Sequence, residues 1–200
     1  MAKIITISNT KGGTGKSTLV YFLHQYFTNV LKTDSAILDL DIQKTITDLS
    51  RRFDKGLKII NPSSFDEVHT LPYQFIFVDT PPYRTGANIE LYKQSDFVLI
   101  PVKPSFLDAM ATQTIISELR SFDRLKFACA LTQVRYGVSF TEDIRSTLES
   151  FGVQILSTMM HQRIAYNRGI IHQSLADEAD TKAQQEIADL SGEILTHIAK

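Results

Sequence analysis

Short apolar runs alternate with longer amphipathic segments along the whole chain. The apolar runs predict strands at 3–8, 35–40, 57–60, 74–79, 96–101, 125–132 and 152–156. Most of these runs are continuous, which is typical of strands that are buried on both faces. Apolar residues recur at helical spacing in segments 17–31, 105–120 and 181–199, which predicts helices there. This order predicts a single α/β domain over residues 1–200, with a mostly parallel, twisted sheet covered by helices on both faces.

The composition agrees with one domain and excludes several classes of protein. Of the 200 residues, 43% are hydrophobic and 22% are charged, and the formal net charge is −1. This balance excludes a disordered chain and argues against a strongly basic nucleic-acid protein, although a local basic patch is compatible with it. The single cysteine, Cys129, excludes an intramolecular disulfide, and its apolar neighbours predict a buried thiol. No apolar stretch is long enough for a signal peptide or a membrane span, so we expect a cytoplasmic protein.

The clearest chemical signal lies between the first predicted strand and the first predicted helix, where residues 11–18 read KGGTGKST. Glycines let the backbone turn tightly, so that its N–H groups can point at phosphate oxygens. A helix that starts near Lys16 adds its positive N-terminal dipole, and the strand-to-helix context is the one in which a P-loop works. We therefore predict a nucleotide-binding loop made of Lys11, Gly12, Gly13, Thr14, Gly15, Lys16, Ser17 and Thr18. In it Lys16 reaches the β- and γ-phosphates, Ser17 ligates Mg²⁺ and Thr18 lies near the α-phosphate.

The loop departs from the common P-loop pattern at its start. Thr10 stands where that pattern has a glycine, and Lys11 precedes the glycine pair. In this the chain resembles the ParA/MinD family of deviant Walker A ATPases, and most of all the short ParA-type partition ATPases. The resemblance extends over nearly the whole chain and implies a P-loop NTPase fold with ATP and Mg²⁺ as cofactors. It also implies an ATP-dependent homodimer, in which Lys11 acts on the partner's nucleotide much as an arginine finger does.

Three aspartates at the ends of predicted strands complete the expected site. Asp39 and Asp41 lie at the end of the second strand and point the same way, because side chains of an extended strand repeat every two residues. Asp79 ends the fourth strand after four apolar residues, as a Walker B acid does. By the resemblance, Asp41 positions or activates the attacking water, Asp79 holds the Mg²⁺ shell and Asp39 supports the metal through water. Ile42 stands where the family has proline, which leaves the local turn open; two solvated acids at a strand end are the alternative for Asp39 and Asp41.

Further matches to the family are weaker. The resemblance places adenine contacts at Thr132 and Gln133 and a second switch at residues 80–82. Two other groups match segments near the family's nucleotide or dimer interface, but a purely structural role is an equal alternative for each. They are Pro101, Pro104 and Asp108 in one segment, and Gln162, Arg163 and Tyr166 in the other.

The resemblance favours a partition or positioning ATPase in plasmid or chromosome segregation. The ATP-bound dimer is expected to bind DNA without sequence preference and so to associate with the nucleoid. A ParB-like or other centromere-binding adaptor protein is expected to stimulate hydrolysis. Non-specific DNA binding rests on cations that contact phosphates. Two clusters supply them, each also compatible with a solvated helix face: Arg120, Arg124, Lys126 and Arg135, or Arg51, Arg52, Lys55 and Lys58.

Two alternatives stay open on the sequence. A MinD-like protein that cycles on a membrane needs a C-terminal amphipathic helix with basic residues on its polar face. Here that face holds Glu186, Asp189 and Glu193, so we expect a helix packed on the domain and no stable membrane association. A nucleotide-gated scaffold that never hydrolyses ATP is the other alternative, and it predicts ATP-dependent dimers without turnover.

Overall fold

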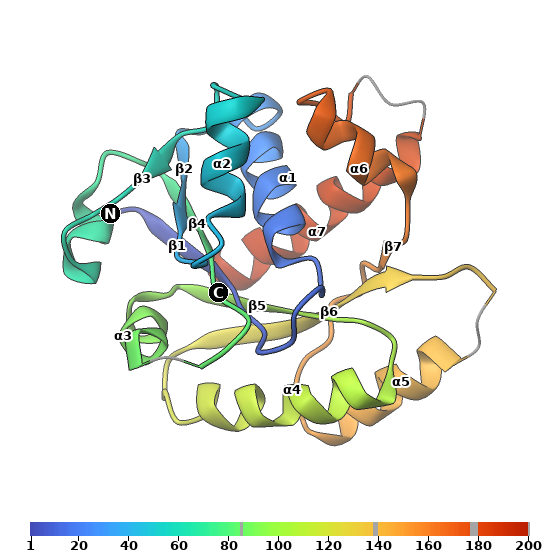
Figure 1. Ribbon diagram of the computed structural model, residues 1–200. Helices are drawn as coiled ribbons and strands as arrows, with labels where there is room; N and C mark the ends of the chain where they lie inside the picture. Colours follow the sequence, from blue (N-terminus) through green and yellow to red (C-terminus); the bar gives the residue numbers. More distant parts are fainter. Residues whose placement is uncertain (85, 138–139, 177–179, 200) are drawn as a thin grey trace.

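A seven-stranded sheet runs through the protein in the order β3-β2-β4-β1-β5-β6-β7 (Figure 1). The computed structural model describes residues 1–84, 86–137, 140–176 and 180–199. Every pair of neighbouring strands is parallel. The strands are β1 (Lys3–Ile7), β2 (Ser35–Asp39), β3 (Ile59–Ile60), β4 (Phe75–Asp79), β5 (Phe97–Val102), β6 (Lys126–Val134) and β7 (Met160–His161). The predicted α/β class with a parallel sheet is therefore confirmed.

Helices cover both faces of this sheet (Figure 1). One face holds α1 (Lys16–Asn29), α2 (Thr45–Arg52), α6 (Ile164–Ile171) and α7 (Thr181–Ala199). The other holds α3 (Gly86–Gln94), α4 (Phe106–Leu119) and α5 (Phe140–Ser150), and a short 3₁₀ helix, η1 (Phe65–Thr70), packs beside α3. The three helices predicted from periodicity are α1, α4 and α7, each within two residues of the predicted bounds.

The strand β5 shows why the apolar runs in the sequence are continuous, because it is buried along its whole length. Phe97 and Leu99 pack in the layer formed with α1 and α7. Val98, Ile100 and Val102 pack in the opposite layer, formed with α4 and α5. Because alternate side chains enter two separate cores, no position of the strand is left for a polar residue.

The predicted strand at 152–156 is wrong as a regular strand, and the seventh strand lies later, at 160–161. Around Ile155 there is only an isolated bridge to Cys129. Leu156 N still donates to the carbonyl of Cys129, at 2.8 Å, but the following N–H groups, of Ser157 and Thr158, donate to the carboxylate of Glu193 in α7, at 2.8 and 2.7 Å. A side chain thus takes the place of β6 as hydrogen-bond acceptor, and regular pairing resumes only at Met160.

The direction in which successive strands are added to the sheet reverses between β1 and β5, at the centre of the sheet, while the strands themselves stay parallel. From β1 the chain passes through α1 on one face, and from β5 it passes through α4 on the other. Such a reversal leaves a crevice outside the carboxyl ends of the two strands, where α/β proteins bind ligands. The loop between β1 and α1, residues 8–15, lies at this point.

Candidate nucleotide-binding site

The loop between β1 and α1 has the backbone of a phosphate-binding turn. Gly13 and Gly15 have left-handed φ angles of 70° and 91°, which residues with a side chain rarely adopt. Gly15 directly precedes α1, and its carbonyl accepts the first helical hydrogen bond, from Leu19 N at 2.9 Å. The unpaired N–H groups of the first helical turn therefore face the loop, where an anion would be stabilised.

Asn9 ties the start of this loop to the neighbouring strand. Its side-chain amide donates to the carbonyl of Pro101 at 2.8 Å, and its side-chain oxygen accepts from Lys11 N at 3.0 Å. Asn9 is buried, whereas Lys11 is exposed. Sequence reasoning did not single out Asn9, and it left Pro101 open between the nucleotide or dimer interface and a structural role. The bond from Asn9 to the Pro101 carbonyl supports a structural role in positioning the loop, and a contact of Pro101 with nucleotide or a second copy stays a prediction.

Lys16 points back into the loop. Only 6% of the residue is exposed, and its Nζ donates to the carbonyl of Lys11 at 3.1 Å. Burial lowers the pKa of Lys16, while the charges of Asp79 and Asp41 act against this shift. The two aspartates predicted from separate strands thus lie close enough to Lys16 to influence its protonation.

Asp79 is fully buried at the end of β4, and neither of its carboxylate oxygens has a hydrogen bond of normal geometry with a described residue. Burial raises its pKa to about 7, and Ser17 and Lys16 act against the rise. A buried carboxylate without a partner is costly, unless a cation neutralises it. Asp79 and the Ser17 hydroxyl therefore fit the few direct protein ligands that Mg²⁺ takes beside a phosphate. The described residues contain no cluster of three or more His, Cys, Asp or Glu that would hold a metal without ligands from a phosphate.

Asp39 holds the loop that follows β2. Its carboxylate accepts hydrogen bonds from Asp41 N at 3.2 Å, from Thr47 N at 2.9 Å and from the Thr47 hydroxyl at 2.7 Å. It lies beside Asp79 in the register of β2 and β4. Three donors already engage Asp39, so its geometry supports positioning of the loop, and its predicted action on Mg²⁺ through water stays a prediction.

Asp41 lies in a closed turn although the proline of the family is absent. Its carboxylate accepts from Gln43 N at 2.9 Å, and its carbonyl accepts from Lys44 N at 2.9 Å. Ile42, in the proline position, is 71% exposed. The turn that the sequence left open is thus formed by side-chain and backbone hydrogen bonds.

The end of β6 reaches the phosphate loop from the other side. The Thr132 hydroxyl donates to the carbonyl of Thr14 at 2.9 Å, and the Gln133 amide donates to the carbonyl of Gly13. Both residues line a cavity of about 260 Å³ that extends from Gly15 and Thr18 to Tyr166. The predicted adenine contacts therefore border a space next to the phosphate loop.

Arg163 and Tyr166 belong to a buried network centred on Glu186 of α7. The Glu186 carboxylate accepts from Arg163 Nη2 at 2.7 Å, from the Tyr166 hydroxyl at 2.6 Å and from His161 N at 3.2 Å. These donors lower the pKa of Glu186 although its burial opposes the shift. Of the three residues predicted in this segment, Gln162 alone is exposed. The sequence assigned Glu186 to the polar face of α7, and no local pattern marks it as buried.

The remaining predicted residues are spread over the molecule. Asp108 lies 3.9 Å from Lys103 in the segment that follows β5. Arg120, Arg124 and Lys126 lie near the start of β6, whereas Arg135 follows its end. Eight strand residues lie between Lys126 and Arg135, a span of about 25–30 Å at ~3.3 Å per residue. Arg135 therefore does not join the other three in one patch.

Comparison with protein families settles the relationship of this chain. Residues 5–198 match the CobQ/CobB/MinD/ParA nucleotide binding domain. The chain belongs to this family. The observed site agrees with that assignment, because the phosphate loop, Asp39 and Asp79 meet at the carboxyl edge of one parallel sheet.

Individual members of the CobQ/CobB/MinD/ParA family are similar over most of their length. Maintenance of carboxysome distribution protein A of Halothiobacillus neapolitanus is 29% identical over 181 residues, which cover 84% of this chain and 83% of that protein. Protein ParA of Rhizobium radiobacter is 24% identical over 206 residues, with 93% and 92% covered. A proposed plasmid partition protein of Borrelia burgdorferi B31, solved with AMPPNP, shares the fold with a TM-score of 0.80, at 18% identity and with 98% and 99% covered.

None of the helices in the described residues is both long enough and apolar enough to cross a membrane. The C-terminal helix α7 packs on α1 and the sheet, with Ala183, Ile187, Leu190 and Ile194 buried. Its acidic residues Glu186 and Glu193 bond to the chain around β7.

Proposed function

We propose that this chain binds ATP with Mg²⁺, hydrolyses it slowly on its own, and uses this cycle to partition or position a cargo in the cell. The main support is the buried carboxylate of Asp79, which has no hydrogen bond of normal geometry with a described residue and lies beside the Ser17 and Lys16 of the phosphate loop. Such a group is expected where a metal–nucleotide complex binds. The relatives named for ParA and for carboxysome distribution support the cellular role.

The residues of the site divide the work of ATP hydrolysis. The N–H groups of residues 12–18 and the Lys16 ammonium bind the phosphates, for which Lys16 has to leave the carbonyl of Lys11. Ser17 and Asp79 hold Mg²⁺, with Asp39 acting through water, and the metal when bound neutralises charge on the phosphates. Asp41 orients the attacking water from its turn after β2. The cavity beside Thr132 and Gln133 receives the adenine.

Dimerisation completes the site in this proposal, and the distribution of exposed apolar residues supports it. Large apolar side chains at the surface mark interaction sites when they gather on one part of a protein. Several of them follow the carboxyl ends of β2, β4, β5, β6 and β7, around the phosphate loop: Ile42, Tyr83, Phe106, Leu107, Tyr136 and Ile164. A second copy placed over this edge buries them, and exposed Lys11 then acts on the partner's nucleotide.

The ATP-bound dimer binds DNA without sequence preference, and an adaptor protein stimulates hydrolysis and release. The test is binding to long non-specific duplex DNA at fixed, modest salt, with ATP, with ADP and without nucleotide. We expect binding with ATP alone, and a steep loss of affinity as salt rises, because phosphate contacts release counterions.

Two different results would contradict two different parts of this proposal. Absence of DNA binding in every state, while ATP-dependent dimers form, would exclude DNA as the partner and leave a protein scaffold. Dimers that form with ATP but never hydrolyse it, whatever is added, would exclude the ATPase cycle.

A further inference from the structure

A row of buried polar side chains links the phosphate loop to residues 80–84, the segment that follows Asp79. The row begins at Ser8, the first residue of the loop, whose hydroxyl bonds to the hydroxyl of Tyr92 in α3 at 2.8 Å. Ser8 and Tyr92 are each 2% exposed. Buried polar groups need a partner, so these two hydroxyls fix each other's position.

Asn88 continues the row toward residues 80–84. It lies four residues before Tyr92 in α3, so the two side chains share one face of the helix. The Asn88 amide donates to the carbonyl of Tyr83 at 3.5 Å. Burial raises the pKa of Tyr92, and hydrogen bonds with Ser8 and Asn88 act against this rise. The Tyr92 hydroxyl therefore lies between the phosphate loop and the segment that follows Asp79.

Residues 80–84 depend on side chains for their attachment, because the two prolines of the segment have no backbone N–H to donate. The Thr80 hydroxyl donates to a carbonyl of β1 at 2.9 Å and holds the start of the segment. At the other end, Asn88 holds the backbone, and Arg84 forms a salt bridge of 2.8 Å with Glu118 in α4. The end of the segment is therefore the part that a change in α3 can loosen.

We propose that Tyr92 is a positioning residue that passes the state of the phosphate loop to residues 80–84. Ser8 moves with the loop when phosphates bind, and the close-packed interior carries this displacement through Tyr92 to Asn88. The end of the segment is thereby held more firmly in the ATP-bound protein than in the empty one. The nucleotide part of this inference rests on the proposed function, whereas the attachment of residues 80–84 through Tyr92 does not.

A direct route from the loop to the segment is the alternative. The Cβ of Pro82 lies 3.9 Å from the point where a side chain at Gly12 would begin, so the two stretches of chain are neighbours. A nucleotide that acts by this route would still act after the Tyr92 hydroxyl is lost. The variant Tyr92→Phe, which keeps the ring and removes only the hydroxyl, separates the two routes.

Trypsin measures the attachment, because it cleaves after exposed Arg84 when the chain there opens locally. Cleavage is followed by mass spectrometry without nucleotide, with ADP and Mg²⁺, and with ATP and Mg²⁺. Without nucleotide, Tyr92→Phe should be cut after Arg84 about fivefold faster than the wild type, because a buried hydrogen bond is lost. ATP should slow the cut about threefold relative to ADP in the wild type and have no effect beyond ADP in Tyr92→Phe.

Calorimetry shows whether the variant still binds nucleotide. The affinity of Tyr92→Phe for ATP should stay within about twofold of the wild type, because a positioning residue does not contact the phosphates.

Ser8→Ala tests whether the two hydroxyls act through one bond. If they do, the double variant with Tyr92→Phe should be cut after Arg84 at the rate of the faster single variant, within about twofold, because a shared bond is lost only once. Effects that multiply in the double variant would show that the bond between Ser8 and Tyr92 is not the link.

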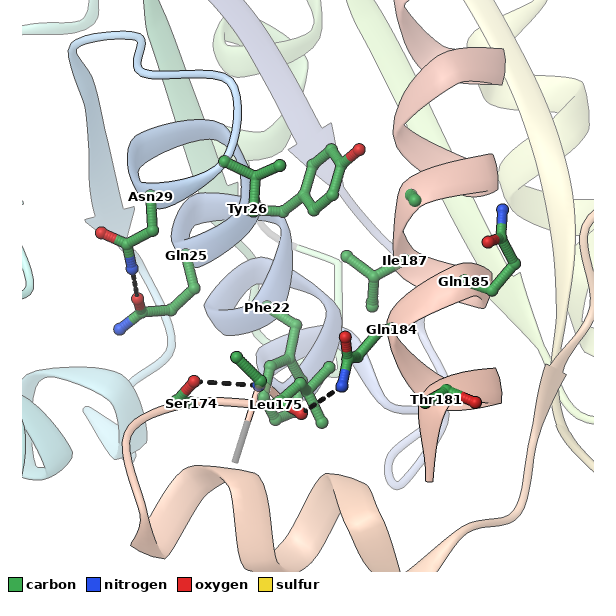
Figure 2. Close-up of a pocket in the computed structure, with 13 residues that line it drawn as sticks. Phe22, Gln25, Tyr26, Asn29, Ser174, Leu175, Thr181, Gln184, Gln185 and Ile187 are labelled. Atoms are coloured by element: carbon green, nitrogen blue, oxygen red, sulfur yellow. Dashed lines mark hydrogen bonds between the residues drawn. The ribbon is translucent and has the colours of Figure 1, made fainter. Parts of the chain in front are cut away.

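Two tyrosines of α1, on the other face of the sheet, give matched controls. Tyr21 is buried and its hydroxyl donates to Asp54 at 3.0 Å, so Tyr21→Phe removes a comparable bond. Tyr26 lies in the wall of a cavity of about 410 Å³ between α1 and α7, where Tyr26→Phe removes a hydroxyl (Figure 2). Both controls should keep the wild-type cleavage after Arg84 and its response to ATP. Cleavage after exposed Lys32 reports general opening and should be equal in every variant.

Several results would overturn the role of Tyr92. They are wild-type cleavage of Tyr92→Phe, an ATP response that survives in this variant, an equal effect of Tyr21→Phe, or a parallel rise of cleavage after Lys32. An ATP-bound wild type that is cut like the ADP form would also overturn it.

Two further comparisons separate this role from dimerisation and from the proposed function. Each reaction is run at two protein concentrations about tenfold apart, because protection by a second copy would rise with concentration. Protection that rises in this way would exclude the route through α3. Absence of ATP binding by the wild type would contradict the proposed function, while the cleavage of Tyr92→Phe without nucleotide would still decide the attachment.

Discussion

At the scale of single residues, two lysines of one loop have opposite surroundings. Lys16 is buried and donates to the loop itself, whereas Lys11 is exposed and bonds through its backbone to the described residues Asn9 and Lys16. A buried lysine can act on the nucleotide of its own chain, and an exposed one is available to a neighbour. This contrast predicts different defects for the two alanine variants.

Lys16→Ala should abolish productive ATP binding, because it removes the cation that reaches the phosphates. Lys11→Ala should retain binding but lose the closed dimer and the stimulated turnover, since a charge supplied in trans is worth ~10³–10⁵ in rate. Nucleotide titration, analytical ultracentrifugation and ATPase assays with and without partner separate the two. Wild-type dimerisation and turnover by Lys11→Ala would contradict the assigned role of Lys11.

His24 makes stability depend on pH. It is 2% exposed, and neither ring nitrogen has a hydrogen bond of normal geometry with a described residue. Burial lowers its pKa from 6.5 to about 4, so the unfolded chain takes up a proton first as pH falls. Its contribution to stability is therefore present above pH 6.5 and is lost between pH 6.5 and 4, by about 2 kcal/mol at pH 5.

Urea denaturation of the wild type and of His24→Leu at pH 7.5 and pH 5 measures this loss. The variant removes the titrating group at similar volume, so it should lose less stability than the wild type between the two pH values. Parallel losses in the two proteins would show that other groups, such as carboxylates, account for the whole effect.

Motif residues could be predicted from the sequence, whereas distant partners could not. The phosphate loop and Asp79 were identified because each sits in a local pattern of strand, turn or helix. Asn9 and Glu186 were missed because their partners, Pro101 and Arg163, are far away along the chain. Sequence periodicity gives the face of an element but not the hydrogen bond that makes a polar residue tolerable inside.

At the scale of elements, α2 connects the loop of Asp41 to the body of the protein. Its eight residues hold a single buried side chain, Ile46, so packing alone fixes it weakly. The hydrogen bonds from Thr47 to Asp39 add a polar anchor at the end that faces the nucleotide site. The position of this helix is therefore coupled to the carboxylate of Asp39.

Thr47→Val should keep the shape of α2 but lose the bond from its hydroxyl to Asp39. We expect a loss of about 1 kcal/mol in local stability and faster hydrogen exchange of the α2 amides. Ser50→Ala is the matched control, because the bond that the Ser50 hydroxyl makes with the described residues stays within α2, to the carbonyl of Thr47 at 2.8 Å. Equal exchange rates in the two variants would show that Asp39 does not anchor this helix.

Elements with a strong repeating pattern were predicted, and those fixed by tertiary contacts were not. The buried strands and the helices α1, α4 and α7 have clear periodicity. The shorter helices α2, α3, α5 and α6 were not predicted, because segments of eight to eleven residues give too little pattern. The seventh strand was misplaced because Glu193, from a different element, decides where pairing with β6 is interrupted.

At the scale of the whole molecule, the exposed apolar residues near the phosphate loop predict where a second copy binds. Leu107→Asp places a charge on this surface at a position that is 73% exposed, so the monomer should fold normally. We expect ATP binding to be retained and the ATP-dependent dimer to weaken by about tenfold or more. Sedimentation velocity measures this, with Ile89→Asp on α3 as a control that is also exposed. Unchanged dimers of Leu107→Asp would place the interface elsewhere.

The register of the sheet puts the side chains of Asp39 and Asp79 next to each other on β2 and β4, both buried. Without a bound cation, the repulsion between the two carboxylates weakens the pairing of β2 with β4 at this end. A bound cation removes that repulsion. Local opening should therefore be most frequent in molecules that have lost their nucleotide. Proteases cut opened chains, so the empty form should have the shorter lifetime in a cell. The supply of ATP would then influence how many copies of the protein survive, as well as which state they adopt.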